Sequence, residues 1–263
     1  RNKKYQEAIH CLEKISFSNL HQDINKESTR VETLAKCHNM IKNYKEAFNY
    51  FVSANKFYPM QAKNVNFDKN KYIEEVKIRK DFFTNKKIDK WSNHKIKKNN
   101  KDPIFLIGFP RSGTTLLDTI LRTHPNINVM EEKGIVAKLV KSINELSDGD
   151  LNILNSINES QIEKVRKDYF DARKLVTIKQ DKSIIYIDKL PLNIIHVGEI
   201  YRIFPNSKFI FAVRHPCDCV LSCFMQNFKL NNAMANFLNL NDAAQLYDDV
   251  IYLWFKFKSI LSI

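Results

Sequence analysis

The chain has 263 residues, enough for one large domain or two smaller ones, and 44% of them are hydrophobic, which is enough for a real core. With only 5 glycines and 7 prolines, the composition argues against a disordered chain. The net charge of +13 favours anionic partners such as nucleotides, sulfated or phosphorylated groups, nucleic acid or a membrane surface, although we expect most of the lysines to be solvated.

The first 59 residues predict helices that resemble tetratricopeptide repeats. Tyr5 and Ala8 recur as Tyr44 and Ala47. Small and aromatic residues then follow at the spacing found in the second helix of such a repeat, at Ala47, Phe51, Ala54 and Pro59. The expected helices are Asn2–Ile15, Ser28–Ile41 and Tyr44–Phe57, with a polar loop at Asn19–Lys26 and Pro59 closing the third helix. An ordinary amphipathic helical bundle is the alternative.

A further helix is predicted over residues 67–83, and a polar, strongly basic linker follows over residues 84–102. The basic residues of this linker include Lys95, Lys97, Lys98 and Lys101. Aromatic residues do not interleave with them at stacking spacing, so we expect a solvated linker and no nucleic-acid partner. The predicted organisation is therefore a domain of repeat-like helices over 1–83, a linker over 84–102 and a second domain over 103–263.

From Pro103 onward, short apolar strands alternate with helices. The predicted strands are Ile104–Ile107, Ile184–Ile187 and Lys208–Val213, and the predicted helices after them are Thr114–Arg122, Leu192–Ile203 and Pro216–Phe228. This alternation predicts an α/β fold, a P-loop-like three-layer α/β/α domain with a parallel sheet. Ligands of such sheets bind at the carboxyl ends of the strands, where Pro110–Thr115, Asp188–Lys189 and Arg214–Pro216 lie.

The first strand leads into a loop with the glycine spacing of a phosphate-binding loop. Gly108 and Gly113 bracket it, and a helix is predicted to begin at Thr114. Backbone N–H groups of such a loop surround an anion, and the helix dipole favours negative charge at the same place. The lysine that normally follows the second glycine is absent, and the cation has moved into the loop as Arg111. The loop is thus expected to bind a phosphate-like group from a donor other than ATP or GTP.

A second cluster begins where the third predicted strand ends. Arg214 leaves that strand, and Ser222 lies inside the following helix. A guanidinium and a hydroxyl that converge on one phosphate make charge-assisted hydrogen bonds. The cysteines at positions 217, 219 and 223 lack zinc-ligand spacing with histidine, so we expect all 5 cysteines to be small buried residues of a reducing compartment. No stretch approaches the ~20 apolar residues of a membrane span and no signal peptide is visible, so we expect a cytoplasmic protein.

At these residues the sequence resembles the sulfotransferase superfamily, in particular the tyrosylprotein branch and bacterial proteins that join tetratricopeptide repeats to a sulfotransferase domain. Four motifs in matching order and spacing carry the resemblance: Pro110–Thr115, His124-Pro125 through Glu131-Glu132, Asp188–Pro191, and Arg214–Asp218 with Ser222. The resemblance implies the donor 3′-phosphoadenosine 5′-phosphosulfate and transfer of its sulfuryl group to a hydroxyl. The acceptor implied is a peptide tyrosine, a saccharide or a small molecule.

The resemblance also implies roles for individual residues. The donor's 5′-phosphosulfate would be held by Arg111, Ser112, Gly113, Thr114 and Thr115, and its 3′-phosphate by Arg214 and Ser222. Glu132 resembles the general base of the tyrosylprotein branch, and Lys189, with Arg111, would stabilise the transferred group without a metal. Glu131 is the rival base, and either carboxylate could instead cap the helix expected near Lys133.

The resemblance ends near Phe228, and family members usually continue beyond the equivalent of Ile263, so we expect the domain to be incomplete at its C-terminus. Two alternatives to a sulfotransferase stay open. A nucleotide kinase or NTPase is disfavoured because the loop lysine and a magnesium-binding aspartate are missing. A non-catalytic module would bind a protein partner through the helical repeats and keep only a remnant nucleotide-binding domain.

Overall fold

The computed structural model describes residues 2–15, 20–62, 65–84, 88, 91, 102–177 and 183–263. These residues form two compact units. The helical unit comprises Arg1–Ile73 with Val220–Leu246, and the sheet unit comprises Glu74–Cys219 with Tyr247–Ile263. Lys95, Lys97, Lys98 and Lys101 of the predicted linker lie outside the described residues, and the predicted division at residues 84–102 stays a prediction.

The helical unit starts with three helices, α1 (Asn2–Glu13), α2 (Leu20–Met40) and α3 (Tyr44–Gln61). Two predictions about them are wrong. Residues 20–26 belong to α2 and not to a loop, because the Gln and Lys among them are good helix formers as well as polar residues. The i,i+3 pair of Arg30 and Glu27 further stabilises this turn. Pro59 lies inside α3, close enough to its end at Gln61 that few helical hydrogen bonds are lost.

Small buried residues let α2 and α3 pack closely. Ala35, Ala47 and Ala54 are almost completely buried along these helices. Within the same unit, the Asn55 side chain donates hydrogen bonds to the backbone carbonyls of Phe224 and Leu238, at 3.1 and 3.2 Å. This packing agrees with paired repeat helices, and the tetratricopeptide assignment itself stays a prediction.

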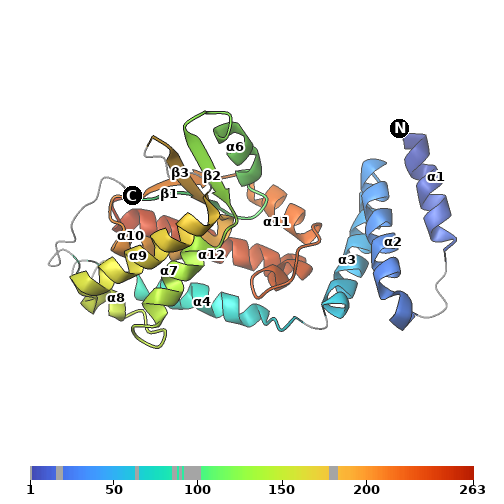
Figure 1. Cartoon of the computed structure of the whole chain (residues 1–263). Helices are drawn as coiled ribbons and strands as arrows, with labels where there is room; N and C mark the ends of the chain where they lie inside the picture. The colour runs from blue at the N-terminus through green and yellow to red at the C-terminus, as the bar shows by residue number, and fades with distance from the viewer. Residues whose placement is uncertain are drawn as a thin grey trace. The chain divides into compact units, whose positions relative to one another are not determined.

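The sheet unit confirms the predicted α/β fold (Figure 1). Its strands are β1 (Ile104–Gly108), β2 (Ile127–Glu131), β3 (Ile185–Lys189) and β4 (Lys208–Ala212). They are all parallel and run in the order β2-β3-β1-β4. The edge strand β2 was not predicted, and it pairs with β3 so that Glu131 is in register with Lys189.

Two layers of helices enclose this sheet. On one face, Leu106, Val129 and Ile187 of three strands pack with Leu117 and Leu121 of α6 (Thr114–Leu121). On the other face, Phe105 meets Tyr169 of α9 (Glu159–Val176) edge-on, and Phe211 packs against Trp254 of α12 (Leu240–Ile260). The three-layer prediction is therefore confirmed.

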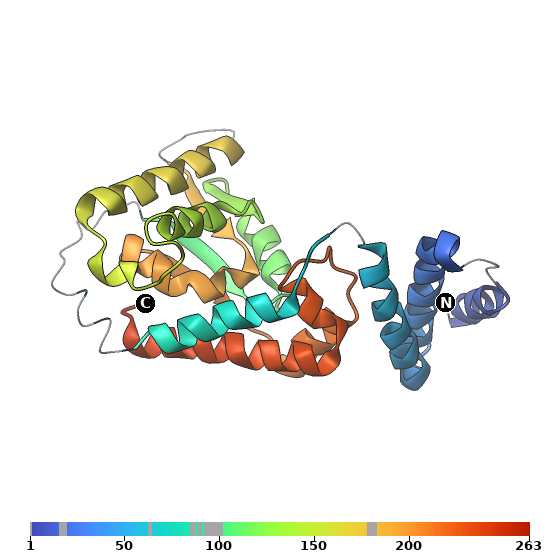
Figure 2. The same ribbon diagram turned by 90° about the horizontal axis from the view of Figure 1, so that it is seen from below.

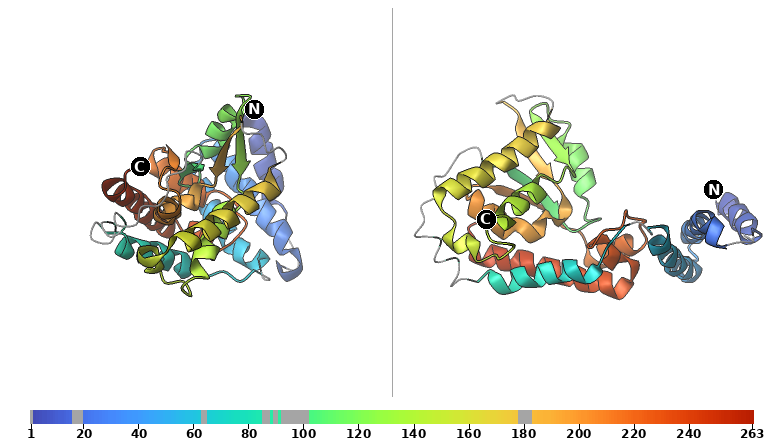
Figure 3. Two further views of the ribbon diagram at one scale, coloured as in Figure 1. Left: turned by 60° about the vertical axis from the view of Figure 1, so that its left-hand side comes forward. Right: turned by 60° about the horizontal axis from the view of Figure 1, so that its bottom comes forward.

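The described residues form several further helices. They are α4 (Lys69–Phe82), α7 (Ile135–Asn144), α8 (Ile153–Ser156), η2 (Pro191–His196), α10 (Val197–Ile203), α11 (Pro216–Phe224) and η3 (Met234–Leu238). Helices α7 and α9 pack side by side (Figure 2). In the sheet unit α4 runs along α12, where Lys80 Nζ lies 2.6 Å from Asp249 Oδ1 (Figure 3). Among the described residues, no helix is both long and apolar enough to cross a bilayer.

Candidate functional site

The four strands all end at the same edge of the sheet because they are parallel. Gly108, Glu131, Lys189 and Ala212 are the last residues of β1 to β4. The loops that follow carry most of the residues singled out from the sequence. The fold therefore brings together motifs that are far apart along the chain.

The loop after β1 has the geometry of an anion-binding turn. A Cβ on Gly108 would lie 2.7 Å from Ala212 O and 2.8 Å from Ser112 Oγ, so only glycine fits where β1 enters the loop. Arg111 and Gly113 have positive φ values of 68° and 99°, which turn the backbone sharply before α6 begins. The N-terminal N–H groups of α6 lack partners within the helix and point into this loop.

The hydroxyls of the loop differ in exposure. Ser112 is 7% exposed, and its Oγ has no hydrogen-bond partner among the described residues. Thr114 is buried, whereas Thr115 and Arg111 are exposed. A buried hydroxyl without a partner is costly unless a ligand supplies one, so Ser112 Oγ fits the oxygen of a bound anion.

The end of β2 brings two carboxylates to one ammonium. Lys189 is completely buried, and its Nζ donates hydrogen bonds to Glu131 Oε1 and Glu132 Oε1, each at 3.0 Å. The Glu132 N–H donates to Lys189 O at 2.8 Å, which continues the strand pairing beyond β2. Glu132 then turns with a φ of 52°, and its side chain is 56% exposed. The sequence identified both Glu132 and Lys189, and the structure shows them in direct contact.

The helix-cap alternative for the two glutamates is wrong. Helix α7 begins at Ile135, and its N-cap is Gly134, with no side-chain cap hydrogen bond. Glu131 and Glu132 are instead bonded to Lys189. Their role is thus tied to the strand-end site and not to the helix.

The surroundings of Glu131 hold it in its charged form. The hydrogen bond and charge of Lys189 lower the pKa of Glu131, and the charge of Arg122 adds to this effect. Arg122 Nη2 lies 3.8 Å from Glu131 Oε2, and the same guanidinium bonds Asp118, which is 2% exposed. Asp118 and Arg122 were not among the residues predicted from the sequence. Their i,i+4 spacing of opposite charges on the loop helix was the signal that could have found them.

Arg214 follows β4 on the same edge of the sheet. Its Nη1 donates a long hydrogen bond of 3.4 Å to Arg111 O, and its Nε lies 3.5 Å from Asp218 Oδ2. Ser222 lies in α11 within the helical unit, whereas Arg214 lies in the sheet unit. Convergence of these two residues on one phosphate stays a prediction.

Asp188, which precedes Lys189 in β3, is buried in the core of the sheet unit. It is completely buried, Tyr169 OH donates to its Oδ2 at 3.3 Å, and its Oδ1 has no partner in the described part of the chain. Burial raises the pKa of this carboxyl to about 7, and the tyrosine hydrogen bond opposes the rise. An aspartate in the unfolded chain has a pKa of about 3.9.

This pKa shift makes stability depend on pH. Between about pH 4 and about pH 7 the folded protein holds a proton that the unfolded chain has released, so the contribution of Asp188 to the free energy of unfolding falls as pH rises. Asp188→Asn should remove this loss. The free energy of unfolding of the variant minus that of the parent should therefore grow by up to about 4 kcal/mol from about pH 4 to about pH 7. Urea denaturation at both pH values measures it. A difference between the proteins that does not change with pH would contradict this expectation.

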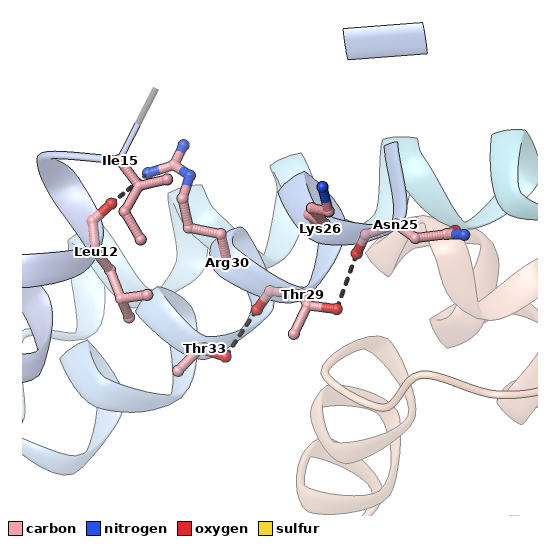
Figure 4. Close-up of a pocket in the computed structure, with 7 residues that line it drawn as sticks. All are labelled: Leu12, Ile15, Asn25, Lys26, Thr29, Arg30 and Thr33. Atoms are coloured by element: carbon pink, nitrogen blue, oxygen red, sulfur yellow. Dashed lines mark hydrogen bonds between the residues drawn. The ribbon is translucent and has the colours of Figure 1, made fainter. Parts of the chain in front are cut away.

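Other candidate features carry none of the predicted site residues. A cavity of about 430 Å³ lies between the end of α1 and α2 and is lined by Leu12, Ile15, Asn25, Lys26, Thr29, Arg30 and Thr33 (Figure 4). The cysteines, all within the described ranges, form no disulfide; Cys37, Cys219 and Cys223 are buried as expected, but Cys11 and Cys217 are exposed. Within the described ranges, no group of three or more His, Cys, Asp or Glu residues is arranged to hold a metal ion, and the expected metal-free chemistry stays a prediction.

Comparison with known proteins agrees with this geometry. The chain is 29% identical over 206 residues to an uncharacterized protein of Aquifex aeolicus (strain VF5), covering 74% of this chain and 26% of that protein. It is 29% identical over 117 residues to protein-tyrosine sulfotransferase 1 of Rattus norvegicus, covering 44% of this chain and 32% of the relative. It is 30% identical over 113 residues to protein-tyrosine sulfotransferase 2 of Gallus gallus, covering 42% of this chain and 30% of the relative.

These matches span only about a quarter to a third of the length of the relatives. The profile of the sulfotransferase family is matched by residues 103–260. This range includes the four described strands, the loop after β1, and the cluster of Glu131, Glu132 and Lys189. The chain therefore belongs to the sulfotransferase family.

Proposed function

We propose that the chain transfers a sulfuryl group from 3′-phosphoadenosine 5′-phosphosulfate to an acceptor hydroxyl. The acceptor oxygen forms a bond to sulfur, the bond from sulfur to the bridging phosphate oxygen breaks, and 3′-phosphoadenosine 5′-phosphate leaves. The acceptor proton passes to Glu132. The observation that carries the proposal is the contact of Lys189 Nζ with Glu132 at the sheet edge where the anion-binding loop also lies.

The loop supplies the site for the donor's phosphosulfate. The backbone turn from Arg111 to Thr115 and the start of α6 present N–H groups to an anion. Ser112 Oγ is buried without a partner in the described structure, which supports a direct contact with a donor oxygen. The exposed Arg111 adds a cation that can stabilise the negative charge that develops on the leaving phosphate.

The carboxylate–lysine pair supplies the chemistry. Glu132 is partly exposed, as a base that meets an incoming acceptor must be. Lys189 has three N–H donors, of which two bond the glutamates, so one remains for the donor's bridging or non-bridging oxygen. Charge that develops on the leaving group is stabilised by this fixed ammonium.

Arg214 and Ser222 are proposed to bind the 3′-phosphate of the donor, which distinguishes it from ATP and ADP. For the acceptor we propose a protein tyrosine, because protein-tyrosine sulfotransferases are among the relatives. The helices α1 to α3 are proposed to bind the protein that carries it, as repeat helices do. A saccharide or small-molecule hydroxyl would use the same base and lysine.

The donor site can be tested without turnover by isothermal titration with 3′-phosphoadenosine 5′-phosphate and with ADP. We expect the former to bind at least about tenfold more tightly, and Arg214→Ala to weaken it by about 10–100-fold, since a charge-assisted hydrogen bond is worth about 1.5–3 kcal/mol. Arg173→Ala is the matched control, because that guanidinium packs on the Phe170 ring in α9. Equal affinities for the two nucleotides, or no binding, would contradict the proposal and favour the non-catalytic interaction module.

A further inference from the structure

The two glutamates that share Lys189 have different surroundings. Among the described residues, the cation that Glu132 contacts is Lys189. Glu131 contacts the same ammonium through Oε1, and its second oxygen Oε2 faces Arg122 at 3.8 Å. One carboxylate is therefore held from both sides, and the other is held from one side and is the more exposed, at 56% against 46%.

The second cation beside Glu131 is itself anchored. Arg122 directly follows α6, and its guanidinium bonds both carboxylate oxygens of Asp118, one turn earlier. Asp118 is 2% exposed, so it fixes the arginine from the buried side of the helix. Charges thus alternate along one chain of contacts, from Asp118 through Arg122 and Glu131 to Lys189.

This chain of contacts links the two halves of the proposed site. Helix α6 begins in the anion-binding loop, and its C-terminal end holds the residue that reaches Glu131. Lys189 is in register with Glu131 across the β2–β3 pairing, so its ammonium is held both by the sheet and by the helix. The helix proposed to bind the donor is therefore linked to Lys189 through Arg122 and Glu131.

Resting on the proposed function, we infer that Glu131 is a positioning residue that, with Arg122 and Asp118, clamps the Lys189 ammonium at the sheet edge, while Glu132 alone is released to act as base. When the donor arrives, its anionic oxygens compete with Glu132 for Lys189. Glu132 then exchanges its lysine hydrogen bond for the acceptor hydroxyl. Glu131 keeps its hydrogen bond to Lys189 throughout the step.

The clamp can be tested first without any nucleotide. Glutamate labelled with ¹³C at Cδ gives one carboxyl resonance per residue, and Glu131→Gln and Glu132→Gln assign the two of interest. Arg122→Gln should move the Glu131 resonance and raise its titration midpoint, because one of its cations is lost, and should leave the Glu132 resonance in place. Lys141→Gln, which alters an exposed i,i+4 pair in α7, should move neither. No response of Glu131 to Arg122→Gln, or an equal response of both glutamates, would overturn the clamp.

Addition of 3′-phosphoadenosine 5′-phosphate then tests whether Glu132 is released from its hydrogen bond to Lys189. At saturation the Glu132 resonance should shift, whereas the Glu131 resonance should stay within its line width. A shift of Glu131 alone would overturn the assignment of roles. If the nucleotide does not bind at all, the proposed donor site fails, and the nucleotide-free experiment still decides whether the clamp exists.

Turnover separates the two glutamates by their effect on the pH profile. Glu132→Gln should lower kcat on the order of 10²-fold and remove the acidic limb of its pH dependence, since the base is gone. Glu131→Gln should lower kcat on the order of tenfold with the acidic limb retained, because a displaced lysine costs orientation and not the base. Glu145→Gln, at an exposed position of the sheet unit, is the control and should match the parent. An acidic limb lost in Glu131→Gln and kept in Glu132→Gln would make Glu131 the base.

Discussion

Replacement of Lys189 by methionine is expected to lower kcat by about 10³-fold, the range seen when one preorganised donor to a developing oxyanion is removed. Methionine fills nearly the same volume, so the completely buried position should stay packed. In the proposed mechanism, however, the positive charge is lost where the leaving phosphate gains negative charge. Initial rates of sulfuryl transfer to a tyrosine peptide, at saturating donor, measure the effect.

The same change leaves Glu131 and Glu132 without the ammonium that both contact at 3.0 Å. Lys189 is the main cause of the lowered pKa of Glu131, so that pKa should rise in the variant even though Arg122 still lies beside Glu131. Lys141→Met is the control for loss of one positive charge, since Lys141 is 68% exposed on α7. A rate for Lys189→Met within a few-fold of the parent would show that the lysine is structural only.

Replacement of Gly198 by alanine is expected to destabilise the fold by about 3 kcal/mol, through overpacking of a filled core. In most helix interiors this exchange is stabilising by roughly 0.5–1 kcal/mol, so the expected sign is reversed. The reason is the ring of Phe83, since a Cβ on Gly198 would lie 2.2 Å from its Cζ and 2.3 Å from its Cε1. Urea denaturation followed by circular dichroism measures the change.

The Phe83 ring cannot move aside to make room. It is completely buried and packs edge-on against the rings of Phe82, Trp91 and Phe257. Phe83→Leu should lower stability by itself and should also relieve the clash. The double variant should therefore be more stable than the sum of the two single effects predicts. Strict additivity would show that the two side chains do not meet.

The loop, its glycines and the strand before it could be predicted from local sequence because their determinants are neighbours in the chain. An apolar run of Ile104 to Ile107 is followed at once by Gly108, and only a glycine tolerates the close approach of Ala212 found there. Arg214 was placed correctly at the end of its strand for the same reason. The family followed from the order of these short motifs.

Strand β2 was missed because nothing in the five residues INVME marks it as more than a loop before Glu132. Its identity as a strand depends on its pairing with β3, whose residues lie far along the chain. The limits of α2 and α3 were missed for a related reason. Glutamine and lysine in the first turns of α2 are compatible with loop and helix alike, and packing and the Glu27–Arg30 pair decide between them.

The sequence by itself determined that this chain has the parallel α/β sheet of a sulfotransferase, with a loop bracketed by glycines after the first strand and cations where later strands end. Neighbouring residues determine those features, because turns, apolar strands and helix starts depend on local sterics and on the hydrophobic pattern. Only the tertiary structure decided which groups meet. Lys189 reaches Glu132 across 57 positions because β2 and β3 pair in parallel, and Arg122 reaches Glu131 because α6 packs beside β2. Strand pairing and the electrostatics of buried groups depend on contacts between distant segments, and no local pattern specifies them.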